Sequence, residues 1–256
     1  MCDKTNSDKS PIVENGISIV AIKDLDGCNF RVPNYQRGYR WTRQQVKDLI
    51  DDIFEFTHNF FKNGQKGIYC IQPLVVQKSH NEEGTDCWDV IDGQQRLTTL
   101  FVILKFFDRH LYGLQYQTRV QSADYLNRLA DHLYAEEQKL DNIDFYHMYE
   151  AFEEVSSKLN GYKDLDKFEE VLLSKVKFIW YAIDGSQNPI DVFTRLNIDK
   201  ISLTPSELIK ALLLNRNNFG SEQDFDKIHM RQQEIASEWD AMENQLQMDN
   251  FWLFFS

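Results

Sequence analysis

The feature that most constrains the fold of this chain is a short β-like run that turns directly into a long apolar helix. Residues 88–91, WDVI, have the aromatic and β-branched content of a strand. The segment DGQQRLTTLFVILKFF follows at once, and in it Leu97, Leu100, Phe101 and Leu104 recur on one helical face. This junction predicts a core that contains both a sheet and helices.

Two further runs have the character of strands. PLVVQ at 73–77 is separated from 88–91 by the turn-like segment SHNEEGTD, so the two runs are expected to pair as a hairpin. VKFIWYAI at 176–183 is rich in β-formers and interrupts the later helical part. ISIVAIKDL, near the N-terminus, is of ambiguous type.

Helices account for most of the remaining chain. Thr42 is the expected N-cap of a helix with apolar residues at helical spacing. Residues 113–174 read as several acidic amphipathic helices, and Asn188 with Pro189 marks a further helix start. The predicted fold class is therefore α/β (α+β) and mostly helical.

The charge balance is acidic overall but basic in one early segment. The chain has 40 acidic and 28 basic residues, a formal net charge of -12, which is a poor overall field for gripping nucleic acid. Residues 131–170 carry twelve Asp or Glu and four Lys, whereas residues 27–47 carry five basic residues and no acid. Any contact with DNA phosphates is therefore expected in this early segment, with Arg40 and Arg43 as candidates.

Composition also bounds the location and the kind of site. No uninterrupted apolar run reaches the ~18 residues of a membrane span, and the polar N-terminus has no signal-peptide core. We expect a cytoplasmic protein that does not contact a membrane. The four cysteines form no CxxC pair, which argues against a zinc knuckle or a disulfide framework.

The most informative chemistry lies in Asp92, Gly93, Gln94, Gln95 and Arg96, at the predicted strand-to-helix turn. The first N–H groups of a helix lack intrahelical partners and attract anions. Gly93 allows close approach of a phosphate, Arg96 can contact phosphate oxygens, and Asp92 can hold magnesium or orient a water. Two adjacent glutamines suit the recognition of polar ligand groups. The alternative is structural: Asp92 and Gln95 have capping-box spacing, with a turn glycine between them.

Two other groups of residues are weaker candidates. In residues 34–41, NYQRGYRW, aromatic and cationic side chains alternate, which suits base stacking and phosphate pairing. The alternative places Tyr35, Tyr39 and Trp41 in the core. Arg195 and Asn197 near a helix end are structural on residue types alone.

Taken in order, VPNYQRGYRW, WDVIDGQQRLTTL, VFTRLNIDKISLTPSELIKALLL, IASEWDAMENQL and FWLFF resemble the N-terminal domain of GmrSD-type restriction endonucleases, from about residue 17 onward. The resemblance implies a ParB/sulfiredoxin-like mixed sheet core elaborated by helices. It divides the chain into a polar tail (1–16), a ParB-like nucleotide-binding core (17–112) and a helical region (113–256), of which 176–197 returns to the core.

The resemblance also implies an NTP-binding and NTP-hydrolysing sensor domain that uses Mg²⁺ with a nucleoside triphosphate. It acts on modified DNA, commonly phage DNA, and an HNH-type nuclease in a C-terminal domain or partner does the cutting. A homo-oligomer is left open. Carried over by position, the catalytic residues are Asp92 (also the metal ligand), Gln94, Gln95 and Arg96, and the nucleotide-binding residues are Gly93, Tyr35, Gln36, Arg37, Arg195 and Asn197.

Some features depart from the family or are missing. Relatives often carry a glycine after the residue matching Asn197, where this chain has Ile198-Asp199-Lys200. The chain has no GxxxxGK[ST] P-loop, so any NTP site must be of the DGQQR kind. Its six histidines show no close pairing, so we expect no nuclease centre. We interpret the final FWLFF as a truncation. Two alternatives to the NTPase stay open: a non-catalytic nucleotide- or DNA-binding switch, and a ParB-like DNA nickase.

Overall fold

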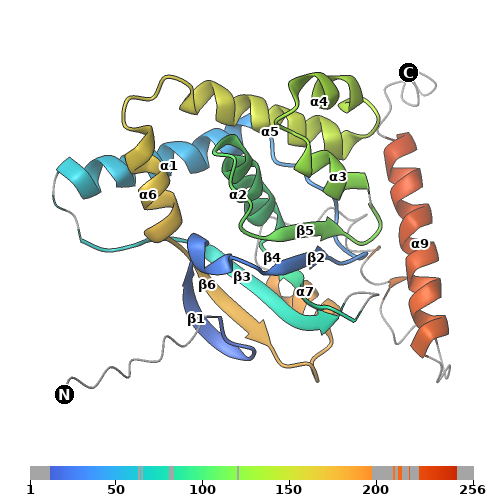
Figure 1. Ribbon diagram of the computed structural model, residues 1–256. Coiled ribbons are helices and arrows are strands. Elements are labelled where there is room, and N and C mark those ends of the chain that lie inside the picture. Colours follow the sequence, from blue (N-terminus) through green and yellow to red (C-terminus); the bar gives the residue numbers. More distant parts are fainter. Residues whose placement is uncertain are drawn as a thin grey trace, which may run out of the picture.

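The computed structural model describes residues 12–62, 64, 66–80, 84–119, 121–197, 210, 213–214, 219 and 225–246. Helices and strands alternate along the chain, and together they confirm a mixed α/β fold that is mostly helical (Figure 1). The elements are β1 (Gly16–Ala21), η1 (Ile22–Leu25), β2 (Asn29–Val32), α1 (Arg43–Lys62), β3 (Tyr69–His80), β4 (Asp86–Asp92), α2 (Gln94–Phe106), β5 (Gly113–Tyr116), α3 (Gln121–Asn127), α4 (His132–Gln138), α5 (Ile143–Leu159), α6 (Leu165–Ser174), β6 (Val176–Ile183), α7 (Pro189–Asn197) and α9 (Phe225–Leu246). The C-terminal segment FWLFF, residues 251–255, lies outside the described residues.

The strands form one six-stranded mixed sheet in the order β1-β6-β3-β4-β2-β5. β3 and β4 pair antiparallel, with Val76 opposite Val90, which confirms the expected hairpin. β6 lies between β1 and β3, antiparallel to the first and parallel to the second, so a segment late in the sequence completes the sheet of the early ones. β2 runs parallel to both β4 and β5.

The sequence pattern missed one strand. Residues 113–174 were expected to be helical, but β5 pairs with β2 as an edge strand. Its side chains alternate, with Leu114 and Tyr116 buried and Gly113 and Gln115 exposed. Four residues are too short for period two to stand out from helical spacing, and the hydrogen bonds from β2 decide the outcome.

Because side chains alternate across a strand, the sheet separates two hydrophobic clusters. Phe178 and Trp180 of β6 point into the larger one, together with residues of α1, α2, α5 and α6. Ile183 points into the smaller one, on the other face, where α7 and α9 contribute residues. Figure 1 shows α1, α2, α5 and α6 on one side of the sheet and α9 along one end of the molecule.

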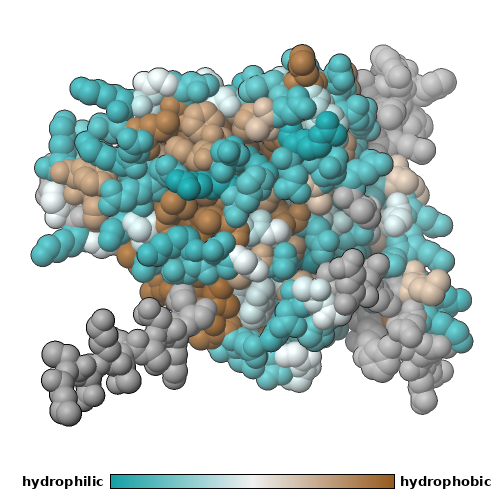
Figure 2. Space-filling model, in the orientation of Figure 1, coloured by the Kyte–Doolittle hydropathy of each residue, from teal (hydrophilic) through white to brown (hydrophobic). Residues whose placement is uncertain are grey.

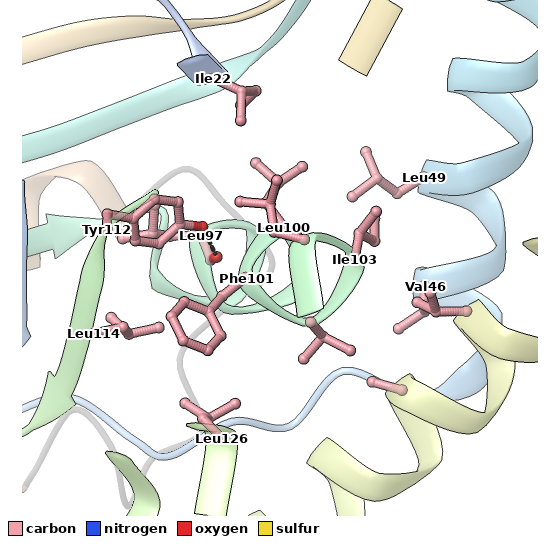
Figure 3. Packing of buried hydrophobic residues seen from close by; sticks show 14 of the residues in the cluster. Ile22, Val46, Leu49, Leu97, Leu100, Phe101, Ile103, Tyr112, Leu114 and Leu126 are labelled. Atoms are coloured by element: carbon pink, nitrogen blue, oxygen red, sulfur yellow. Dashed lines mark hydrogen bonds between the residues drawn. The ribbon is translucent and has the colours of Figure 1, made fainter. Parts of the chain in front are cut away.

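Helix α2 is the central helix of the larger cluster. Every residue from Leu97 to Lys105 is buried, not only one face, which is the pattern of an internal helix. Figure 3 shows its side chains packed between η1, β5, α1 and α3, with Leu100 beside Ile22 and Ile103 beside Leu49. The residues of the strand-to-helix turn are therefore attached to a rigid, fully packed element.

No helix within the described ranges is both long and apolar enough to cross a bilayer. The view in Figure 2 shows hydrophilic side chains interspersed with smaller hydrophobic areas.

Candidate functional site

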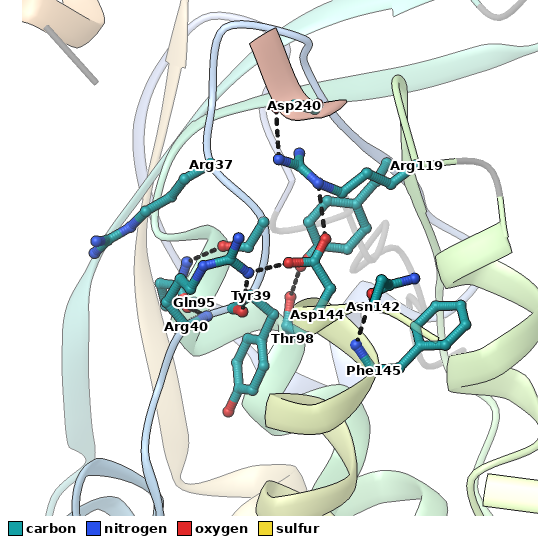
Figure 4. A network of polar contacts seen from close by, with 12 residues as sticks. Arg37, Tyr39, Arg40, Gln95, Thr98, Arg119, Asn142, Asp144, Phe145 and Asp240 are labelled. Atoms are coloured by element: carbon teal, nitrogen blue, oxygen red, sulfur yellow. Dashed lines mark hydrogen bonds and ion pairs between the residues drawn. The ribbon is translucent and has the colours of Figure 1, made fainter. Parts of the chain in front are cut away.

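The two glutamines of the DGQQR segment, residues 92–96, bind the backbone of residues 34–41, which we call the YQR segment. Gln94 donates from Nε2 to the carbonyl of Arg37, at 2.9 Å. Gln95 donates from Nε2 to the carbonyl of Gly38 and accepts the Arg40 N–H through Oε1, both at 2.9 Å (Figure 4). These hydrogen bonds join segments that are 57 residues apart. Most of the amide oxygen and nitrogen atoms that were expected to bind a ligand are therefore bonded within the protein.

One amide oxygen of the glutamine pair lacks a hydrogen-bond partner. Gln94 is buried, and its Oε1 has no hydrogen-bond partner among the described residues. A buried carbonyl oxygen without a donor is unfavourable by about 1–3 kcal/mol, so Oε1 is the part of the glutamine pair that a ligand or a bound water can satisfy.

Gln36 and Tyr35 fix the other side of this junction. Gln36 is buried and donates from Nε2 to the carbonyls of Val90 and Ile91 in β4, the second at 3.1 Å. Tyr35 packs in the smaller cluster, with its ring centroid 5.4 Å from that of Phe193 in α7. Burial raises the pKa of Tyr35 far above its usual range, so its hydroxyl stays neutral. Both residues hold the YQR segment against the sheet.

Asp92 does not act as the N-cap of α2, contrary to the capping-box expectation. The N-cap is Gly93, with φ 101° and no side-chain cap hydrogen bond, and Gln94 is the first helical residue. The Gln95 side chain is instead directed to the YQR segment. Gly93 has no side chain to cap the helix, and the first N–H groups of α2 carry the positive end of the helix dipole.

Arg96 is held against β3 by contacts of its own. It donates to Gln72 Oε1 at 2.6 Å and to the carbonyl of Pro73 at 2.8 Å, and its Nη2 lies 3.6 Å from Asp92 Oδ2. Its Nε is buried without a partner. Burial lowers the pKa of Arg96, and the Asp92 carboxylate opposes that shift. The guanidinium is therefore fixed in place, and its Nε–H is the group that a ligand could still bind.

Asp92 fits the role of a single magnesium ligand. The described residues contain no group of three or more His, Cys, Asp or Glu side chains able to hold a metal ion. Mg²⁺ that binds with a nucleotide takes one or two carboxylates and obtains its other ligands from phosphate and water. Asp92, half-buried at the end of β4, can supply one such ligand.

The cations of the early basic segment differ in their surroundings. Arg40 is ion-paired with the buried Asp144 of α5. Arg43 binds Glu150 on the same helix, with Nη2 to Oε1 at 2.9 Å, and this pairing raises the pKa of Arg43. Arg37 is exposed, and Figure 4 shows it pointing away from Asp144. Both expected DNA-contact residues are thus engaged by acids of α5, and Arg37 and Arg43 are the exposed ones of these three cations.

Sequence reasoning missed a polar network behind the YQR segment. Asp144 also binds Arg119 Nε at 2.7 Å, and Arg119 reaches Asp240 of α9 at 2.8 Å (Figure 4). Asp144 and Asp240 stand in largely polar helices and Arg119 in the loop after β5, so residue types did not single them out. Gly38 could have signalled the contact, because a Cβ there would collide with the Asp144 carboxylate.

The third motif, which contains Arg195 and Asn197, lies on α7, and α7 packs beside Tyr35 of the YQR segment. Val192 and Phe193 of α7 are buried in the cluster that contains Tyr35 and Ile91. α7 starts as expected, with Asn188 Oδ1 accepting the Ile190 N–H at 3.1 Å. The backbone of Arg195 and Asn197 belongs to α7, but their side chains lie outside the described part, as do Ile198-Asp199-Lys200.

A protein-family model described as "GmrSD restriction endonuclease, N-terminal domain" matches residues 19–214. No curated protein sequence matches the chain. The matched range contains all three motifs and ends before α9.

Proposed function

This chain belongs to the family of GmrSD restriction endonuclease N-terminal domains, and we propose that it binds and hydrolyses a nucleoside triphosphate at the N-terminus of α2. As a component of a restriction endonuclease system its wider partner is DNA, and we propose that NTP turnover regulates cutting of modified DNA by an HNH-type nuclease domain.

The observation that carries the proposal is the packing of residues 34–41 against the start of α2. Gln94 and Gln95 bind the backbone of residues 37–40, and Gln36 binds carbonyls of β4 just before the strand-to-helix turn. Two segments more than fifty residues apart thus meet at a helix N-terminus that favours an anion. The third motif lies next to them, because Phe193 of α7 packs on Tyr35.

In this proposal the phosphates lie at the first N–H groups of α2, where the helix dipole favours negative charge. Arg37 at the exposed rim and the remaining N–H of Arg96 neutralise charge that develops in the transition state. Gln94 Oε1, the unpaired acceptor, orients the attacking water. Asp92 would hold the Mg²⁺ that accompanies the nucleotide, and the ion would supply charge neutralisation at the phosphates.

The test is phosphate release from ATP, GTP, CTP and UTP, with and without Mg²⁺. Arg96→Ala should lower turnover at least ~10-fold, since a charged contact to phosphate is worth more than ~1.4 kcal/mol. Arg109→Ala is the matched control, because Arg109 is exposed and pairs with Glu169 away from the three motifs. Unchanged turnover in a folded Arg96→Ala protein would remove this residue from the chemistry.

A second candidate function is a binding switch without hydrolysis. It is favoured by the engagement of both glutamines and of Arg96 in contacts within the protein. Nucleotide titration by calorimetry separates the two functions: binding with no phosphate release in any of the four reactions supports the switch.

A further inference from the structure

A buried ionic network connects five side chains from separate parts of the chain, and we call it the Asp144–Asp240 network. Asp144 lies between Arg40 and Arg119, and Asp240 lies between Arg119 and Lys210, at 2.8 and 2.6 Å. The side chains involved are only 3–14% exposed. At this depth ion pairs are weakly screened, so loss of one member leaves its neighbours in an unfavourable state.

One end of the network meets the DGQQR segment. Gln95 accepts the Arg40 N–H and donates to the Gly38 carbonyl, so it fixes the backbone from which the Arg40 side chain projects. Arg40 Nη1 also returns to the Tyr39 carbonyl at 2.9 Å. Gly38 lies so close to the Asp144 carboxylate that no side chain would fit between them. A shift of this loop against α2 therefore moves Asp144.

The other end of the network anchors α9. Helix α9 is largely polar, and among its described side chains those of Ile228, Ala236 and Asp240 are buried. Asp240 also accepts a hydrogen bond from Thr118 at 2.7 Å, just beyond β5. Among these described side chains little apolar surface is buried, so the buried carboxylate of Asp240 and the cations that pair with it are a main attachment of this part of α9. α9 lies beyond the residues matched by the family model.

We propose that the Asp144–Asp240 network is a conformational coupling element, through which the Gln95-bound loop and the docking of α9 stabilise each other. Such a coupling is reciprocal: loosening the loop favours release of α9, and release of α9 loosens the loop. The inference does not depend on nucleotide binding, because every contact in it lies within the protein.

Hydrogen exchange of the full chain, read separately for α9 and for β6, tests this coupling. Gln95→Ala should raise exchange in α9 about 3- to 10-fold, as expected for the loss of neutral hydrogen bonds, while β6 stays protected. Asp240→Asn should raise it at least ~10-fold. Gln115→Ala, an exposed glutamine on β5, is the control and should leave both elements unchanged.

The double variant decides the question. If the network couples the two ends, Gln95→Ala adds little to α9 exchange once Asp240→Asn is present. Multiplied effects, no effect of Gln95→Ala on α9, or an equal rise in α9 and β6 would overturn the proposal. Should Asp240→Asn not fold, Thr118→Val removes one contact to Asp240 without stranding a charge and serves in the same cycle.

Discussion

Replacing Gly93 by alanine separates two reasons for a glycine at the start of α2. The backbone there has φ 101°, a region that L side chains rarely adopt. A Cβ at this position would lie 3.0 Å from Leu74 Cδ1 and 3.1 Å from the Pro73 carbonyl oxygen. The glycine is therefore required by the turn and by its packing on β3, before any phosphate is considered.

The magnitude follows from these two terms. The left-handed backbone alone costs an alanine about 1–2 kcal/mol. Crowding against a side chain and a backbone carbonyl adds about 1–3 kcal/mol, as in overpacked cores. Gly161 is the matched control, because its φ is +78° and a Cβ there would meet nothing within 4 Å. Gly161→Ala should thus show the backbone term alone.

Equilibrium urea unfolding, followed by tryptophan fluorescence, measures both variants. We expect Gly93→Ala to be less stable than Gly161→Ala by about 1–3 kcal/mol, with equal m-values. Equal midpoints for the two variants would refute the crowding argument, and the positive φ of Gly93 would remain as the structural reason for a glycine there. The NTP assay on the same proteins shows whether turnover falls beyond the loss of stability.

Three further outcomes are expected. Arg37→Ala should weaken binding to duplex DNA and reduce the salt slope by about 1, because Arg37 is exposed, whereas Arg40→Ala should lower the melting temperature more than Arg37→Ala does, because it strands the buried Asp144; equal effects in both assays would contradict this assignment. Burial and Asp26 raise the pKa of Cys28 to about 11, so its thiolate is scarce at pH 8. Peptide mapping after alkylation at that pH should find Cys28 modified at least ~10-fold more slowly than the exposed Cys70, with its rate rising toward pH 11. The purified chain should leave glucosylated, methylated and unmodified plasmids intact with Mg²⁺ or Mn²⁺ and NTP, and specific cleavage would favour the nickase alternative.

The candidate site was predictable as a set of residues but not as an arrangement. DGQQR and YQR stood out because of their residue types and their resemblance to a family. Their mutual hydrogen bonds did not, because Gln94 and Gln95 look equally suited to a ligand and to a neighbouring backbone. Only the packed structure shows that three of the four side-chain amide oxygen and nitrogen atoms of these two glutamines are bonded within the protein.

Local features of the fold were determined by the sequence itself. The hairpin, the strand-to-helix turn, the helix after Thr42 and the start of α7 at Pro189 all depend on residues a few positions apart. Steric preferences, capping and side-chain periodicity act over that range, so they can be read without knowing the fold.

Only the tertiary structure decided which cations of the early basic segment pair with acids of α5. Arg37, Arg40 and Arg43 are equivalent in the sequence, yet two of them meet acids of α5 more than a hundred residues away. β5 is a strand because β2 lies beside it. The partner of a charge, or of an edge backbone, is set by contacts distant in sequence, and local pattern carries no information about them.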